Sequence, residues 1–99
     1  MADLQVVATI EVKPGSEEMV EGALRSLVTG TRGEEGCIAY DLYRSEAEPG
    51  TFVTIERWRS QADLDAHLQG EHVQQAFAAA GEHLAGAPGI HPLRPLEVR

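Results

Sequence analysis

The chain has 99 residues, the usual size of one domain, and neither a repeat nor an interdomain linker divides residues 1–99. Apolar residues make up 42% of the chain and charged residues 24%, which indicates a globular protein and argues against disorder. The net charge of −8 repels phosphate backbones and anionic headgroups, so we expect no nucleic acid and no membrane partner. A single cysteine, no secretory signal and no apolar run of bilayer length together predict a cytoplasmic protein.

The first third of the chain predicts a strand followed by a helix. Apolar residues alternate with others over residues 4–12, the period of a strand with one apolar face. The Pro-Gly pair at residues 14–15 ends this strand, and Ser16 is placed to cap a helix. Apolar residues then recur at helical spacing up to a stop over residues 30–33: Met19, Val20, Ala23, Leu24, Leu27 and Val28.

The middle of the chain predicts a hairpin. Residues 37–44 and 51–59 have strand character, and the Glu-Pro-Gly within residues 45–50 is typical of the loop between antiparallel neighbours. Three glycines at positions 30, 33 and 36 follow a helix and flank two glutamates, so we interpret this run as a turn and not a phosphate loop.

The last third predicts two helical stretches and an edge strand. Ser60 starts a capping-box-like sequence in which Asp63 is placed to reach back to the Ser60 amide, and the helix runs to about residue 69. Gly70 interrupts, and a second stretch continues to residues 86–88 with one apolar face, formed by Val73, Phe77, Ala80 and Leu84. Prolines 92 and 95 restrict residues 90–99 to an edge strand.

This order of elements predicts an α+β fold, a ferredoxin-like βαββαβ antiparallel sheet with helices on one face. The opposite face would carry Val7 together with one of two alternating sets of residues. These are Cys37, Ala39 and Tyr43, or Ile38, Tyr40 and Leu42. Either set makes that face too apolar for water, so we expect a homodimer that buries it with the proline-containing tail.

Four segments together resemble the antibiotic biosynthesis monooxygenase (ABM) domain family. They are EGCIAYDLYRS at residues 35–45, FVTIERWRS at 52–60, LDAHL at 64–68 and HVQQAF at 72–77, preceded by Lys-Pro-Gly at 13–15. The resemblance covers nearly the whole chain. It implies a dimeric α+β barrel with a pocket between helices and sheet, and oxygenation of quinols, anthrones or related phenolic compounds without metal or flavin.

The same family has a haem-degrading branch, which we rank below the cofactor-free function. Its pattern is an Asn on the first strand, a Trp on the first helix after the sheet and a haem-ligating His on the next helix. This sequence contains no Asn, and the corresponding places hold Val7 or Ala8, His67 and Phe77.

His67 is our candidate catalytic residue. It lies beside Leu64 and Leu68 at the buried edge of a helix, and an imidazole with an ordinary pKa of about 6.5 can take a phenolic proton near neutral pH. The alternative is a half-buried histidine held by a backbone carbonyl. Asp63, four residues earlier, has the spacing to orient the ring, although helix capping or a solvated ion pair is its favoured role.

Tyr40, Trp58 and Phe77 are our candidate substrate-binding residues, and core or dimer packing is the alternative role for the first two. The sequence does not decide whether Tyr40 and Trp58 share a sheet face, because a one-residue slip reverses the parity. Glu56 alternates with Arg57 and Arg59 on the third strand, so one of these two charged sets must face a packed surface. We favour an Arg–Glu pair across a dimer. Scattered histidines 72, 83 and 91 make no zinc site, and Cys37 is a small buried side chain.

Two functions follow. The first is a monooxygenase without metal or other cofactor, which deprotonates a small phenolic substrate so that its anion reduces dioxygen and the radical pair recombines in a dry pocket. The second is a dimeric module that binds a small aromatic metabolite without turnover, because a fold does not fix a function. Oxygen uptake with simple quinols separates them.

Overall fold

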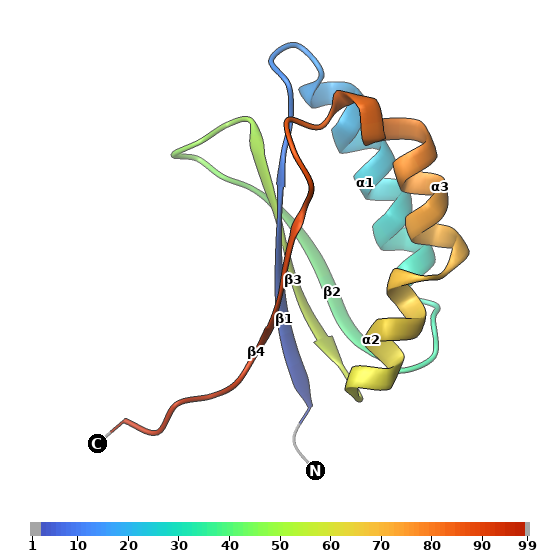
Figure 1. The fold of residues 1–99 in the computed structure, drawn as a ribbon, viewed down its shortest axis with the longest axis vertical. Coiled ribbons are helices and arrows are strands. Elements are labelled where there is room, and N and C mark those ends of the chain that lie inside the picture. Colours follow the sequence, from blue (N-terminus) through green and yellow to red (C-terminus); the bar gives the residue numbers. More distant parts are fainter. Residues whose placement is uncertain (1–2, 99) are drawn as a thin grey trace.

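A computed structural model describes residues 3–98 as a four-stranded antiparallel sheet with its helices on one face (Figure 1). The strand order is β2-β3-β1-β4, which confirms the ferredoxin-like α+β fold. The elements are β1 (Leu4–Glu11), α1 (Glu17–Thr31), β2 (Cys37–Arg44), β3 (Thr51–Trp58), α2 (Gln61–Leu68), α3 (Glu71–Ala80), a 3₁₀ turn (Gly81–His83) and β4 (Gly89–Leu93). No helix within residues 3–98 is long and apolar enough to cross a membrane.

The central strand β1 shows why the alternating pattern is decisive. Its side chains at Val6, Ala8 and Ile10 are buried beneath the helices, whereas Gln5 on the other face is exposed. The strand pairs with β3 on one side and with β4 on the other. Because β4 is the sheet edge, Pro92 removes no hydrogen bond from an interior strand, as predicted, although the strand ends at Leu93.

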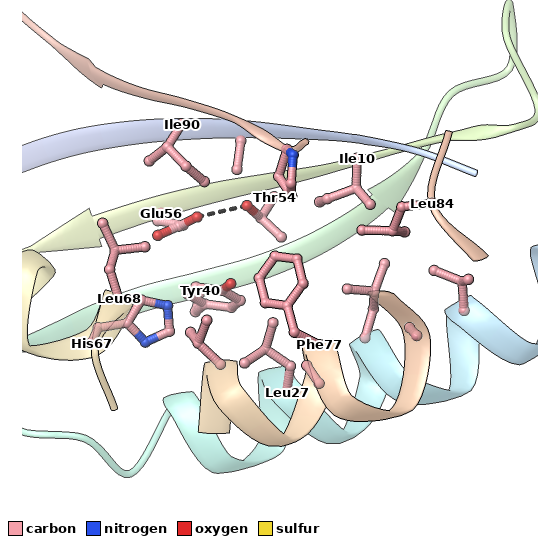
Figure 2. A pocket seen from close by; sticks show the side chains of 17 residues that line it. Ile10, Leu27, Tyr40, Thr54, Glu56, His67, Leu68, Phe77, Leu84 and Ile90 are labelled. Carbon is pink, nitrogen blue, oxygen red and sulfur yellow. Dashed lines mark hydrogen bonds between the residues drawn. The ribbon is translucent and has the colours of Figure 1, made fainter. Parts of the chain in front are cut away.

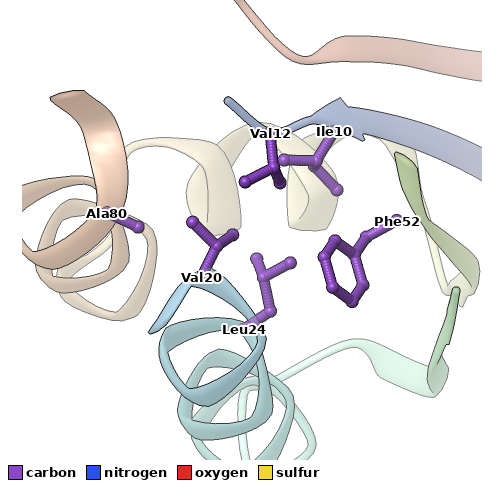
Figure 3. Packing of buried hydrophobic residues seen from close by; sticks show 6 residues of the cluster. All are labelled: Ile10, Val12, Val20, Leu24, Phe52 and Ala80. Carbon is purple, nitrogen blue, oxygen red and sulfur yellow. The ribbon is translucent and has the colours of Figure 1, made fainter. Parts of the chain in front are cut away.

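Two clusters of buried side chains hold the helices on the sheet. The first joins β1, α1, β3 and the end of α3, and consists of Ile10, Val12, Val20, Leu24, Phe52 and Ala80 (Figure 3). The second joins β1, α1, β2, β3 and α2, and consists of Val6, Val28, Tyr40, Trp58 and Leu64. Full burial of a large apolar side chain stabilises a fold by about 1.5–3 kcal/mol. Both ends of the helical layer are therefore anchored.

A bulge in β2 corrects our expectation for the open face of the sheet. The register shifts between Cys37, opposite Trp58, and Ala39, opposite Arg57. Each expected set is thereby split between the two faces. Cys37 packs on the helix side with Tyr40 and Leu42. Ala39 lies opposite the exposed Arg57 and therefore on the open face. A bulge adds one residue to one strand, which strict alternation cannot represent.

The helix ends depart from the expected capping in two places. Ser16 caps no α1 amide through its side chain, because its Oγ lies 3.1 Å from Nδ1 of His83. Ser60 does cap α2, since its Oγ accepts from the Asp63 amide at 3.2 Å. Asp63 does not reach back to the Ser60 amide and instead accepts from the Ser60 hydroxyl at 2.9 Å. The second helical stretch ends at Ala80, before the 3₁₀ turn.

Candidate functional site

A cavity of about 70 Å³ lies between the sheet and the helical layer (Figure 2). Side chains from all four strands and from α1, α2 and α3 line it. One water molecule requires roughly 10–15 Å³ of such space, so the cavity has room for a small ligand fragment. Its lining is apolar apart from four side chains, which are Tyr40, Thr54, Glu56 and His67. The exposed residues of the rim are Leu68, Phe77 and Ile90. An apolar cavity with few convergent polar groups is the usual form of a small-molecule site.

His67 closes one end of this cavity, and only 4% of the residue is exposed. Its ring centroid lies 5.5 Å from that of Tyr40 and 4.8 Å from that of Trp58. Its Nδ1 lies 2.8 Å from Oε1 of Glu34, so the partner of the ring is a carboxylate and not the backbone carbonyl of the alternative interpretation.

Asp63 does not orient His67, because its carboxylate is engaged elsewhere. Arg59 donates to both Asp63 oxygens, at 2.8 Å and 2.9 Å. These bonds, followed by the bond from Ser60, hold the pKa of Asp63 below its usual value. The favoured role of Asp63 in capping and ion pairing is therefore the observed one.

Glu34 is the functional candidate that sequence reasoning missed. It precedes His67 by 33 residues and lies in the turn between α1 and β2, where no periodicity marks it. In the sequence, Glu34 is visible only as one of two glutamates between Gly33 and Gly36. Gly36 in that run has a φ of +84°, and a side chain there would overlap the Asp63 carboxylate, so the turn that carries Glu34 packs closely on α2.

Tyr40 contributes a buried phenol to the cavity wall. Burial raises the pKa of Tyr40, and the nearby Glu56 carboxylate raises it further. The phenol therefore stays protonated through the neutral range, where it can donate a hydrogen bond but does not act as a base.

Glu56 is the charged residue of β3 that the fold covers, whereas Arg57 and Arg59 are exposed. Its Oε2 accepts from the Thr54 hydroxyl at 2.6 Å, and its Oε1 accepts from Nε1 of Trp58 at 2.8 Å. A buried carboxylate needs such partners, because unpaired burial of a charge is costly. This network fixes a negative charge at the cavity wall.

Three of the four candidate site residues line the same cavity, and Trp58 is the exception. Tyr40 and Trp58 share the helix-covered face, with ring centroids 6.4 Å apart in an edge-to-face arrangement. Trp58 is fully buried in the second core cluster, so it supports Tyr40 and His67 from behind and does not contact the cavity. Phe77 lies at the rim with 45% of its surface exposed.

On its other side, the His67 ring borders a surface hollow. Glu34 and His72 line this hollow, together with acidic residues at positions 35, 63 and 71. Within residues 3–98, His, Cys, Asp and Glu side chains form no group of three or more that could hold a metal ion. Contacts of Glu34 with His67 and His72 connect the residues of this hollow.

The chain is similar to known proteins over most of its length. A model of the family described as "Antibiotic biosynthesis monooxygenase" matches residues 4–79. The Bacillus subtilis (strain 168) protein "Putative monooxygenase YcnE" is 40% identical over 81 residues, which cover 82% of this chain and 84% of that protein. The Escherichia coli (strain K12) protein "Probable quinol monooxygenase YgiN" is 34% identical over 82 residues, which cover 72% of this chain and 78% of that protein.

Solved structures show the same relationship. A crystal structure described as an antibiotic biosynthesis monooxygenase superposes with a TM-score of 0.87 at 33% sequence identity, and the match covers 95% of this chain and 99% of that one. The names of these relatives support a monooxygenase-like function for the chain.

Proposed function

The chain belongs to the antibiotic biosynthesis monooxygenase family, and from that premise we propose that it oxidises a quinol, anthrone or related phenolic substrate with dioxygen, without metal or flavin. The observation that carries the proposal is the position of His67. A buried imidazole with a carboxylate on Nδ1 borders an apolar cavity that also holds a protonated phenol. The name of the Escherichia coli relative, which specifies a quinol, supports the substrate class.

In the proposed reaction, His67 acts as the general base. Nε2 takes the proton of the substrate hydroxyl, which requires contact within about 3 Å or through one water. The resulting anion gives one electron to dioxygen, and the two radicals combine to form a carbon–oxygen bond. The oxygen–oxygen bond then breaks, so one oxygen atom stays on the substrate. The other leaves as water, taking one proton back from His67 and one hydrogen from the substrate.

The other cavity residues are assigned positioning and solvent-excluding roles. Tyr40 faces the substrate as a neutral hydrogen-bond donor, because the raised pKa of Tyr40 keeps its proton in place. Phe77 provides an aromatic side chain at the rim, where its half-exposed ring can contact a bound substrate. The apolar lining keeps water from the radical pair, which favours its recombination.

A homodimer is part of the proposal, because the open face of the sheet remains apolar. Among the exposed side chains are Ile38, Tyr43, Ile55 and Leu93, which are each between 44% and 52% exposed. Isolated apolar residues at a surface are ordinary, but several on one sheet favour an interface with a second copy. Two such sheets face to face, with the tail after β4 across them, would complete the dimeric α+β barrel.

Oxygen consumption tests the proposal directly. The chain is supplied with simple quinols under air, with oxygen uptake and product mass recorded beside His67→Gln as the matched control. We expect uptake by the wild-type chain, one oxygen atom in the product, and little uptake by the variant. Binding of quinols without oxygen uptake would instead favour the binding-module alternative.

A further inference from the structure

The two oxygens of Glu34 contact two different histidines. Oε1 lies 2.8 Å from Nδ1 of His67, and Oε2 lies 2.6 Å from Nδ1 of His72. The His67 side chain is 3% exposed and that of His72 is 31% exposed, so one carboxylate joins a buried ring to a ring at the surface hollow. This arrangement brings together the turn after α1, helix α2 and helix α3.

The chemistry of a carboxylate fixes the hydrogens in this cluster. An ionised carboxylate only accepts hydrogen bonds, so each neutral imidazole must donate through Nδ1–H. A neutral imidazole with hydrogen on Nδ1 carries its free lone pair on Nε2. Nε2 of His67 is therefore the basic atom, on the edge of the ring away from Glu34.

The place of His72 in this cluster is built into α1. Gly30 lies beneath the His72 ring, and a Cβ at residue 30 would overlap its Cδ2 and Nε2 atoms. The helix therefore carries no side chain at the one position where the ring rests. A glycine inside a helix destabilises it by roughly 0.5–1 kcal/mol relative to alanine. The close packing of His72 on Gly30 offsets this loss of helix stability.

We propose that Glu34 is the positioning residue for His67, holding its ring in the form that presents a free Nε2 to the cavity, and that His72 anchors Glu34. This inference rests on the proposed role of His67 as the base. A fixed carboxylate also stabilises the imidazolium that forms when Nε2 takes the substrate proton. Glu34 and His72 themselves contact no substrate in this scheme.

The first test reads the hydrogen position without turnover. In protein with ¹⁵N-labelled histidine, spectra are recorded over a pH series, and the ring nitrogen shifts of the neutral form distinguish Nδ1–H from Nε2–H. We expect His67 in the wild-type chain to carry its hydrogen on Nδ1 alone. In Glu34→Ala we expect a mixture of the Nδ1–H and Nε2–H forms. A wild-type His67 with hydrogen on Nε2 would overturn the proposal even if the variant did not fold.

The second test uses turnover of whichever quinol the wild-type chain oxidises. Glu34→Ala should lower kcat by about 10²-fold with little change in KM, within the range associated with general-base catalysis. Glu35→Ala is the matched control, because Glu35 is the neighbouring glutamate, its side chain is 80% exposed and it pairs with Arg59. His72→Ala should lower kcat by less than Glu34→Ala does.

The outcomes separate this inference from the proposed function. If the wild-type chain oxidises no quinol, anthrone or related phenol, the assignment of His67 as a base fails, while the nitrogen shifts still decide whether Glu34 sets its hydrogen position. If quinols are oxidised and Glu34→Ala keeps the kcat of Glu35→Ala, Glu34 is not a positioning residue. A rise in KM with unchanged kcat in Glu34→Ala would likewise contradict the proposal.

Discussion

The imidazole of His67 packs against the indole of Trp58, with ring centroids 4.8 Å apart and ring planes inclined by 37°. The same indole donates its Nε1–H to Glu56, so Trp58 connects the candidate base to the buried carboxylate of the cavity wall. A residue expected to contact substrate is thus part of the support for two residues that border the cavity. Substitutions at His67 therefore affect packing as well as chemistry.

Replacement of His67 separates these two effects when two variants are compared. His67→Gln keeps a hydrogen-bonding side chain of similar length beside Glu34, whereas His67→Ala leaves a void against Trp58. Both should lower quinol turnover by about 10²- to 10⁴-fold, because each lacks a base. Only His67→Ala should also lose stability appreciably, measured by urea unfolding. Turnover retained in His67→Gln would show that His67 is structural.

Removal of either hydrogen-bond donor that contacts the Glu56 carboxylate should destabilise the fold. Trp58→Phe keeps an aromatic ring but removes the Nε1–H that bonds Glu56, which leaves a buried carboxylate oxygen without this partner. The expected cost is about 1–3 kcal/mol in the free energy of unfolding, plus the loss of indole packing. Thr54→Val removes the other donor while keeping the side-chain shape, and should cost a similar amount. Equal stability of Thr54→Val and the wild-type chain would mean that the network contributes little.

The regular parts of this fold were predictable because they follow side-chain periodicity. Alternation in β1 and helical spacing in α1 placed Val6, Ile10, Val20 and Leu24 in the core. Tyr40 was not placed, because one extra residue at the β2 bulge sets its face and nothing in the alternation marks a bulge.

The candidate site was predictable only where its residues lie on regular elements. His67 and Phe77 lie on helices with one buried side, so their approach to the sheet could be expected. Glu34 lies in a turn, and its contact with His67 spans 33 residues of chain. Such a contact depends on how α2 and α3 pack beside the turn, which is a tertiary property.

The open sheet face should decide the oligomeric state. Ile55→Lys places a charge on the central part of that face, opposite Val7 and Asp41 in the sheet register, without entering the helix-covered core. We expect light scattering to give a dimer mass for the wild-type chain at micromolar concentration and a monomer mass for Ile55→Lys. Lys13→Ala, on the exposed loop after β1, is the control that should stay dimeric. A monomeric wild-type chain would contradict the barrel arrangement.

The buried phenol of Tyr40 predicts a defined alkaline behaviour. Burial, and then the Glu56 carboxylate, raise the pKa of Tyr40 above the ordinary tyrosine value of about 10. The unfolded chain therefore releases this proton first as the pH rises past about 10, and native stability falls from there toward the folded pKa. Below pH 10 both states are protonated, so this contribution to stability is fully present.

Comparison with Tyr40→Phe isolates the effect. Between about pH 9 and 11 the tyrosinate absorbance of the folded wild-type chain should rise by no more than that of folded Tyr40→Phe. In urea, the absorbance rise of the wild-type chain should exceed that of the variant by the contribution of one tyrosine. The urea midpoint of the wild-type chain should also fall more steeply above pH 10 than that of the variant. Ionisation of Tyr40 near pH 10 in the folded chain, with circular dichroism unchanged, would show a solvated phenol and make Tyr40 a competing candidate for the base.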